Sequence, residues 1–374
     1  MLFNEIIGQA VIKKRLIQTV KDNRISHAQL LLSTEGSGGL ALALAYAQYI
    51  SCTDKSEVDA CGNCPSCIKC AKLIHPDIHF IYPLAISKDV RESTDVVEKW
   101  RKAFLTNPYL SLRDWFEYLD AENKQAIIGS EESAAILRKL SLTTYESEFK
   151  IMIIWLPEKM NTTAANKILK ILEEPTDKTL FILVTENADQ LLQTIISRTQ
   201  LIKIPKITNE DLSQAIQKNY SLSPEETQRI VRLSEGNYNT ALQLINNDES
   251  ATNNYAIFQT WMRACLKFDA LKVLTWIDEL AVTGREQQKN FLIYALHIIR
   301  ECLLLNYADT NLTRLDGEEL LFVKKFSLFI HSANCEQFVE ELNAAHQQIE
   351  RNANPKILFL DLSFKINEFL NIKK

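Results

Sequence analysis

The first 205 residues alternate short apolar runs with amphipathic stretches, a pattern typical of parallel strands separated by helices. Two of the runs are rich in Ile, Leu, Val and Phe without strict alternation, as expected for strands covered on both faces. We therefore predict an α/β domain with a helix-covered parallel sheet. Its expected strands are Gln29–Leu32, Ile78–Tyr82, Lys150–Ile154, Thr179–Val184 and Gln200–Ile204.

Helix signals dominate the sequence after residue 205. Thr208 has the position of an N-cap, and Ser223–Glu226 combines an N-cap hydroxyl, a proline at the first helical position and a glutamate at the third. Residues 206–249 therefore predict a small helical module. Helical periodicity continues through residues 250–374, which predict a third, all-helical domain.

The composition excludes several classes of protein. Of 374 residues, 46% are hydrophobic and 24% are charged, which is typical of a globular chain and not of a disordered or collagen-like one. The net charge of −5 means that any contact with nucleic acid must come from a local patch or through a partner. No run of about 18 uncharged apolar residues occurs, so we expect no membrane contact and a cytoplasmic location.

Five of the eight cysteines fall within nineteen residues, between Cys52 and Cys70, which in a cytoplasmic chain indicates metal. Thiolates separated by two residues can converge on one tetrahedral ion, and four soft ligands with no open position describe structural zinc. A helix would turn Cys70 away from this group, so we predict a free buried thiol there. Unrelated reduced cysteines are the alternative. The predicted ligands, in a zinc module of about 52–75, are Cys52, Cys61, Cys64 and Cys67.

A strand, a Gly-rich turn and a helix follow one another over residues 30–50, the context in which backbone N–H groups bind phosphates. The pattern G-x-x-x-x-G-K-[ST] is nevertheless broken, because Ser33 replaces the first glycine, Gly39 the lysine and Leu40 the hydroxyl that would hold Mg²⁺. This turn predicts a phosphate loop without its catalytic side chains.

A second motif of the ATPase site is also missing. The strand that ends near Ile154 continues into Trp155 and Leu156, where an ATPase would carry the acids that hold Mg²⁺ and polarise water. We therefore expect no ATP hydrolysis by this chain. Weak or no nucleotide binding is expected at the degenerate loop, through Gly36, Gly38 and Gly39.

Further motifs occur in a fixed order along residues 3–245. They are Ile7-Gly8-Gln9, Arg24–Ala28, the degenerate loop, the cysteine module followed by His75-Pro76-Asp77, Met160–Pro175 with its terminal Leu172-Glu173-Glu174-Pro175, Thr185 after the fourth strand, and Leu192–Thr199. This arrangement resembles the delta-prime family of bacterial DNA polymerase III clamp-loader subunits. The helical remainder agrees with that family in length and class.

The resemblance implies an AAA+ domain over residues 1–205, a helical lid over 206–249 and a helical collar used for oligomerisation over 250–374. It also implies a hetero-oligomeric ring with gamma/tau-like ATPase subunits and a delta subunit. Such a complex, part of the DNA polymerase III holoenzyme, loads the sliding clamp onto primer-template DNA during replication. Within it, this chain would be a rigid member that does not hydrolyse ATP.

Arg198 matches the family's arginine that enters the ATP site of the neighbouring subunit, where a guanidinium can stabilise charge on the γ-phosphate. Ser197 matches a residue that would orient it. Two positions depart from the family pattern: Thr199 replaces the usual cysteine of the motif, and Thr240 stands where catalytic relatives carry a second sensor arginine. An ordinary ion pair between Arg198 and an acidic neighbour is the alternative.

An aromatic-rich insertion at residues 83–128 is longer than the family leads us to expect. Rings interleaved with Lys102 and Arg113 are able to stack on single-stranded bases, but packing on the AAA+ core is the favoured interpretation.

Three other functions compete with the delta-prime interpretation. A clamp-loader ATPase subunit is opposed by the side chains at positions 39, 40, 155 and 156. A zinc-containing DNA-binding regulatory protein on an inactive AAA+ scaffold is opposed by the negative net charge. A zinc hydrolase is opposed because four thiolates leave no position for water.

Overall fold

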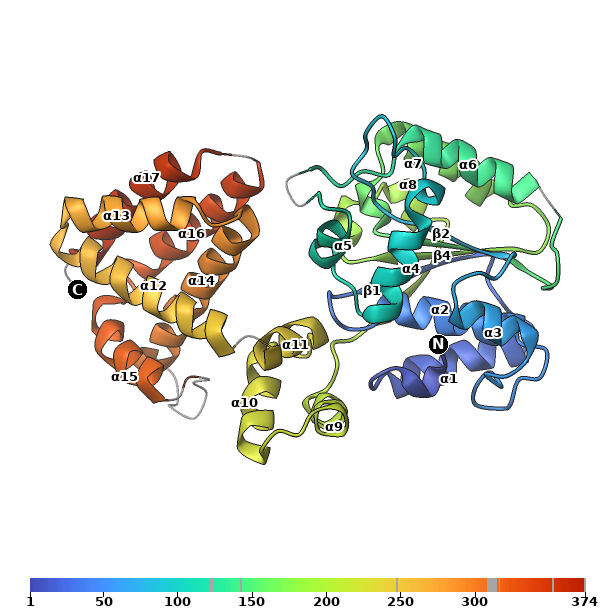
Figure 1. Ribbon diagram of the computed structural model, residues 1–374, viewed down its shortest axis with the longest axis horizontal. Helices are drawn as coiled ribbons and strands as arrows, with labels where there is room; N and C mark the ends of the chain where they lie inside the picture. Colours follow the sequence, from blue (N-terminus) through green and yellow to red (C-terminus); the bar gives the residue numbers. More distant parts are fainter. Residues whose placement is uncertain are drawn as a thin grey trace. The chain divides into compact units, whose positions relative to one another are not determined.

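The chain forms two compact units, Met1–Gln243 and Leu244–Lys374, in a computed structural model (Figure 1). The structure describes residues 1–121, 124–141, 143–246, 248–307, 315, 317–351 and 353–372. Each unit has a hydrophobic core of its own.

A five-stranded sheet lies at the centre of the described part of the first unit, in the order β2-β3-β4-β1-β5, and all of its pairings are parallel. The predicted parallel sheet is confirmed, with strand ends shifted by at most one residue. β1 lies between β4 and β5, and the Gly-rich turn follows it at the carboxyl edge of the sheet, where open α/β sheets bind ligands. The strands are β1 (Ala28–Ser33), β2 (Ile78–Ile81), β3 (Lys150–Trp155), β4 (Thr179–Thr185) and β5 (Gln200–Ile204).

Helices cover both faces of this sheet. Leu31, Ile153 and Ile182 point to one face, and Leu30, Ile154 and Leu183 point to the other, as strand alternation requires. The first face packs against α1 (Ala10–Lys21), α2 (Gly39–Ser51), α3 (Pro65–Ala71), α4 (Val97–Thr106) and α5 (Leu112–Tyr118). The second packs against α6 (Ser130–Ser141), α7 (Thr162–Glu173) and α8 (Gln193–Ile196). Single 3₁₀ turns are η1 (Phe3–Glu5), η2 (Ser93–Val96), η3 (Pro157–Lys159) and η4 (Ala188–Gln190).

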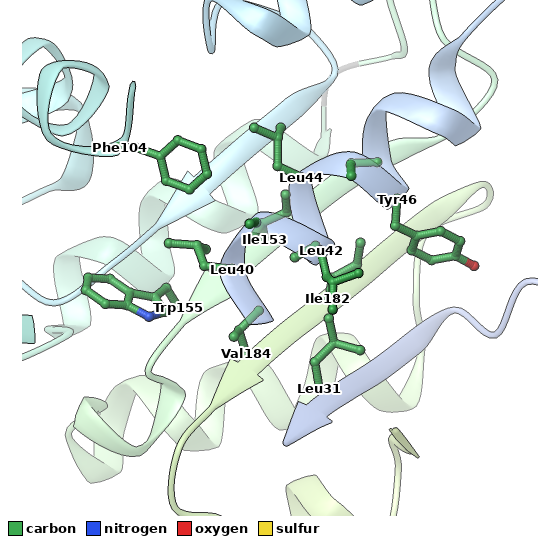
Figure 2. Close-up of a cluster of buried hydrophobic side chains, with 14 of the residues drawn as sticks. Leu31, Leu40, Leu42, Leu44, Tyr46, Phe104, Ile153, Trp155, Ile182 and Val184 are labelled. Carbon is green, nitrogen blue, oxygen red and sulfur yellow. The ribbon is translucent and has the colours of Figure 1, made fainter. Parts of the chain in front are cut away.

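α2 is the central helix of the first face, and every residue from Gly39 to Ser51 is buried. Its alternating Ala and Leu residues favour helix and leave no polar stripe, which is typical of a helix enclosed by protein. Figure 2 shows Leu40, at its first turn, among Phe104, Trp155 and Val184. The N-terminus of α2 is therefore held rigidly against β3 and β4.

Five of the six aromatic residues of the insertion are core residues, and the sixth, Tyr118, is half-buried against the same core. Trp100, Phe104 and Trp115 are almost completely buried, and Trp100 stacks on Tyr82 with ring centroids 4.0 Å apart. The Trp115 indole N–H donates to the Pro83 carbonyl oxygen at 2.7 Å. The packing interpretation is confirmed, since buried rings offer no face to a nucleic-acid base.

Three helices follow the sheet: α9 (Asn209–Asn219), α10 (Pro224–Ser234) and α11 (Tyr238–Asn246). The predicted helix starts are confirmed. The Thr208 hydroxyl accepts the Asp211 N–H, and Ser223 and Glu226 form a capping box.

The described residues of the second unit are built from helices, as predicted. Its core contains two stacked indoles, Trp261 and Trp276, with centroids 4.7 Å apart. Within the described ranges, no helix is both long and apolar enough to cross a membrane. The helices are α12 (Asp248–Lys267), α13 (Ala270–Ala281), α14 (Arg285–Tyr307), α15 (Gly317–Phe326), α16 (Cys335–Glu350) and α17 (Pro355–Leu370), with a 3₁₀ turn, η6 (Ser327–Phe329).

Candidate functional site

Four cysteine sulfur atoms converge between α2 and α3. The Sγ atom of Cys52 lies 3.6 Å from that of Cys61 and 3.9 Å from that of Cys64, and the Cys61 and Cys67 sulfurs are 3.9 Å apart. A zinc ion with Zn–S bonds of about 2.3 Å needs tetrahedral edges of about 3.8 Å. The donor set and its spacing therefore fit zinc, and within the described residues these four form a group that could hold a metal ion.

Backbone amides point at these sulfurs. The N–H groups of Cys61, Cys64 and Cys67 donate to the sulfurs of Cys52, Cys61 and Cys64 at 3.3–3.4 Å, a pattern that stabilises thiolates around a metal. Burial opposes ionisation of Cys64, but hydrogen bonds from the amides of Cys67 and Thr53 lower the pKa of its thiol to about 6. Cys64 is therefore a thiolate near neutral pH, the form that binds metal.

Cys70 lies outside this group, three residues after Cys67 on α3. Its side chain is buried, and burial raises the pKa of the thiol to about 12. The structure thus places Cys70 as a neutral core residue.

The loop between α2 and α3 also holds the start of the chain. The Asp59 carboxylate accepts the backbone N–H groups of Phe3 at 3.0 Å and Asn4 at 2.9 Å. The Leu2 side chain lies against Gly62. The cysteine module therefore orders the N-terminal segment as well as itself.

The Gly-rich turn has the left-handed backbone expected of a phosphate loop. Gly36 and Gly38 have φ values of +68° and +89°, which favour glycine. A Cβ atom on Gly39 would overlap the hydroxyl of Ser33, and one on Gly38 would lie 2.8 Å from Cε1 of Tyr109. Protein side chains therefore pack closely on the turn where a phosphate would approach.

Apolar side chains also occupy the end of β3, where an ATPase would carry its Mg²⁺-binding acids. Trp155 and Leu156 are buried, and the Trp155 ring lies 5.5 Å from that of Trp100. The hydroxyl of Thr185, after β4, donates to a Glu158 oxygen at 2.8 Å. The other Glu158 oxygen accepts the N–H groups of Glu186 at 2.9 Å and Asn187 at 3.3 Å.

Carboxylates gather at this edge of the sheet. Burial, together with the neighbouring carboxylates of Glu35 and Glu158, raises the pKa of Glu186 to about 8. The three groups come from the Gly-rich turn, η3 and the residue after β4. Because Glu186 keeps its proton near neutral pH, the carboxylates of Glu35 and Glu158 are the ones that would repel a polyphosphate.

Arg198 lies just after α8, with its side chain about one third exposed. One guanidinium nitrogen, Nη2, forms an ion pair with Oε1 of Glu173 at 2.6 Å. The other, Nη1, donates to the Thr194 carbonyl oxygen at 3.1 Å and to the Ser197 hydroxyl at 3.3 Å. Ser197 thus contacts the arginine that it was predicted to orient, and Glu173 is the acidic neighbour foreseen in the alternative interpretation.

Sequence reasoning assigned no role to Glu173, Glu158 or Tyr109. Glu173 belongs to the Leu-Glu-Glu-Pro stretch that carries part of the resemblance. The sequence therefore marked Glu173 but did not indicate that it pairs with Arg198. Tyr109 was one aromatic residue among several in the insertion. Nothing in the local pattern distinguishes these residues, because each contact joins distant parts of the chain.

Comparison with known proteins gives a consistent set of relatives. A family model described as DNA polymerase III, delta subunit, matches residues 8–208. The chain is 25% identical over 253 residues to DNA polymerase III subunit delta′ of Bacillus subtilis (strain 168), an alignment that covers 68% of this chain and 64% of that relative. It is 22% identical over 361 residues to DNA polymerase III subunit delta′ of Escherichia coli (strain K12), covering 96% of this chain and 93% of the relative. The chain thus spans less than two thirds of the length of the Bacillus relative.

A solved structure also resembles the chain. A DNA polymerase III gamma subunit-related protein from Thermotoga maritima aligns over 97% of this chain and 100% of that one, with 16% sequence identity and a TM-score of 0.43.

Proposed function

Because this chain belongs to the DNA polymerase III delta-subunit family, we propose that it is a delta-prime-like, non-hydrolysing subunit of a clamp-loader complex. In this role it helps to load the sliding clamp onto primer-template DNA during replication. Its partners are gamma/tau-like ATPase subunits and a delta subunit, and it reaches the clamp and the DNA through the complex.

The observation that carries the proposal is the contrast between two sites in the first unit. The chain's own phosphate turn is packed by Ser33 and Tyr109 and lacks the lysine at Gly39. Arg198, by comparison, keeps its guanidinium at the surface. A chain that cannot use ATP itself but presents an arginine is suited to act on a neighbour's nucleotide.

Electrostatics support the inactive site. ATP brings several negative charges, which an active loop neutralises with a lysine and Mg²⁺. Here the carboxylates of Glu35 and Glu158 are near Glu186, which keeps its proton near neutral pH, at the carboxyl edge of the sheet. Binding of a triphosphate would have to overcome their repulsion.

Arginine donation follows from the contacts of Arg198. Nη1 is held by the Thr194 carbonyl and the Ser197 hydroxyl, which fix the guanidinium plane, while Nη2 is paired with Glu173. An exposed ion pair is worth only about 0–1 kcal/mol, so a γ-phosphate of higher charge can replace Glu173 as the partner.

The remaining parts have structural roles in this proposal. Zinc, held by Cys52, Cys61, Cys64 and Cys67, stabilises the fold and the N-terminal segment. Residues 206–249 act as the lid, and residues 250–374 form the collar through which the subunits assemble.

The test is the DNA- and clamp-stimulated ATPase rate of a complex reconstituted with the organism's own ATPase and delta subunits. We expect Arg198→Ala to assemble normally and to lower the rate at least about tenfold, because a trans arginine stabilises transition-state charge. The isolated chain is expected to show no ATP turnover.

Glu173→Ala is the matched control. It removes the same surface ion pair but keeps the guanidinium, so the complex should retain most of its rate. An equal loss with both variants, or no loss with Arg198→Ala, contradicts arginine donation. ATP hydrolysis by the isolated chain contradicts the inactive nucleotide site.

A further inference from the structure

Tyr109, in the insertion, lies among three segments that are far apart in sequence. Its ring packs on Gly38 of the Gly-rich turn, where an added Cβ would lie 2.8 Å away. Its hydroxyl accepts the backbone N–H of Ile7 at 2.7 Å. Its ring centroid is 4.9 Å from that of Tyr238, the first residue of α11.

The contacts of Tyr109 are those of a bound aromatic ligand. The residue is only 8% exposed, and the one polar atom of its side chain is hydrogen-bonded. Burial raises the pKa of this phenol well above its usual range, so the hydroxyl stays neutral. Small-molecule pockets that are mostly apolar and offer one polar contact bind groups of this kind, a flat ring with one hydrogen-bonded oxygen.

Two asparagines hold the Tyr109 backbone in place. The Asn107 side-chain oxygen accepts the Tyr109 N–H at 3.0 Å, and the Asn239 amide donates to the Tyr109 carbonyl at 2.5 Å. The Asn107 side-chain amide in turn donates a hydrogen bond to the side-chain oxygen of Asn239 at 2.8 Å. The buried polar groups of this loop are thus satisfied by a residue of α11, which favours one fixed position.

The Gly-rich turn contacts α11 directly as well. The Tyr238 N–H donates to the Gly36 carbonyl at 3.1 Å, and the Asn237 side chain lies against Gly36. The turn, the start of α11 and the insertion therefore form one packed cluster within the first unit.

We propose that the insertion supplies an internal ligand: Tyr109 occupies the space in front of the phosphate turn and fixes α11 to the sheet without any nucleotide. A nucleotide base is excluded because the ring already fills the gap between Ile7, Gly38 and Tyr238. The turn lacks the lysine and the Mg²⁺ ligands, and the Tyr109 ring packs where a nucleotide would otherwise pack. This inference concerns the chain alone and does not depend on Arg198.

The experiment is chemical rescue in the full-length chain. Tyr109→Ala removes the ring and leaves a cavity beside Gly38, and p-cresol, which reproduces the side chain, is added as the probe. We expect millimolar p-cresol to raise the Tm of Tyr109→Ala by about 2 °C or more and to leave the native protein unchanged. Toluene should give a smaller rise, since it cannot accept the Ile7 N–H.

Hydrogen exchange measures the second part of the proposal. Amides of α11 within residues 238–243 should exchange at least about tenfold faster in Tyr109→Ala than in the native chain, and p-cresol should reverse this change. Tyr145→Ala, which removes an exposed tyrosine, should alter neither quantity.

Tyr109→Phe keeps the test decisive if the alanine variant does not fold. This variant retains the ring but loses the hydrogen bond with Ile7, so we expect a lower Tm and no response to p-cresol. Equal p-cresol shifts in native and Tyr109→Ala proteins, or unchanged exchange in α11, would overturn the proposal. Binding of a fluorescent ATP analogue by the native chain at micromolar concentration would also overturn it, without bearing on the role of Arg198.

Discussion

Ser33 and Gly39 are two substitutions in the phosphate turn that depend on each other. In an active loop the first position is glycine, and here the serine hydroxyl occupies the space that a side chain at position 39 would enter. A lysine at position 39 would therefore not fit unless Ser33 moved, because the Ser33 side chain already lies against Gly39.

We predict that Gly39→Lys destabilises the chain by about 1–3 kcal/mol, as overpacking does in a closed core. Ser33→Gly combined with Gly39→Lys should recover part of this loss, since it removes the overlapping hydroxyl. Thermal unfolding of the single and double variants measures the coupling. Neither variant should hydrolyse ATP, because Leu40 and Trp155 still replace the Mg²⁺ ligands; turnover in either would show that another residue supplies them.

Glu186 makes stability depend on pH in an unusual direction. Burial and the carboxylates of Glu35 and Glu158 raise its pKa to about 8, above the ordinary value of 4.5. Between these values the unfolded chain releases a proton that the folded chain retains. The free energy of unfolding therefore falls as the pH rises through this window.

Glu186→Gln should remove this dependence, because an amide does not ionise. The Tm difference between the variant and the native chain should be small near pH 5 and should grow in favour of the variant up to pH 8. Glu226→Gln is the control, since hydrogen bonds from Ser223 lower the pKa of Glu226 from 4.5, and its Tm difference should therefore stay constant between pH 5 and pH 8. A Tm difference for Glu186→Gln that stays constant with pH would refute the assignment.

At the scale of elements, the cysteine module connects α2, α3 and the start of the chain. Its buried residues Ala60, Cys70 and Leu73 belong to the core on the first face of the sheet. Asp59 and the sulfur group add contacts that order its loops. Metal binding to such a module contributes directly to folding.

We predict about one zinc ion per chain by metal analysis, and loss of that ion in Cys61→Ser. The variant should lower the Tm of the first unit and increase exchange of the Phe3 and Asn4 amides. Cys70→Ser is the matched control, because this thiol lies outside the sulfur group and the variant should keep its zinc. Full stability of the metal-free chain would exclude a structural role for zinc.

At the scale of the whole molecule, the two units have separate cores and no shared hydrophobic cluster among the described residues. The core of the second unit is organised around Trp261, whose indole stacks on Trp276 and donates to the Ser363 hydroxyl at 2.9 Å. We therefore expect each unit to unfold on its own.

Trp261→Ala should destabilise the second unit by about 3–5 kcal/mol, the range for removal of a large buried ring. Hydrogen exchange should show the loss of protection only within residues 244–372, while the sheet amides keep theirs. Loss of protection in β1 or β4 would mean that the units unfold together.

Local sequence was sufficient for the strands, the helix starts, the convergence of four cysteines and the broken ATPase motifs. These features depend on periodicity, capping residues and spacing, which act over a few residues at a time. The packing of the aromatic insertion also followed from residue type, since large rings favour the core.

Only the tertiary structure decided which residues meet at the sites. The contacts of Tyr109 with Ile7 and Tyr238 and of Arg198 with Glu173 join segments that no local pattern connects. The electrostatic interaction of Glu186 with Glu35 does the same. Such pairs are fixed by the closure of long loops around a shared core, where packing of the whole unit determines which side chains become neighbours. The sequence thus predicted that the ATPase side chains are missing, and the folded chain decided which side chains pack on the Gly-rich turn, because that packing joins distant segments.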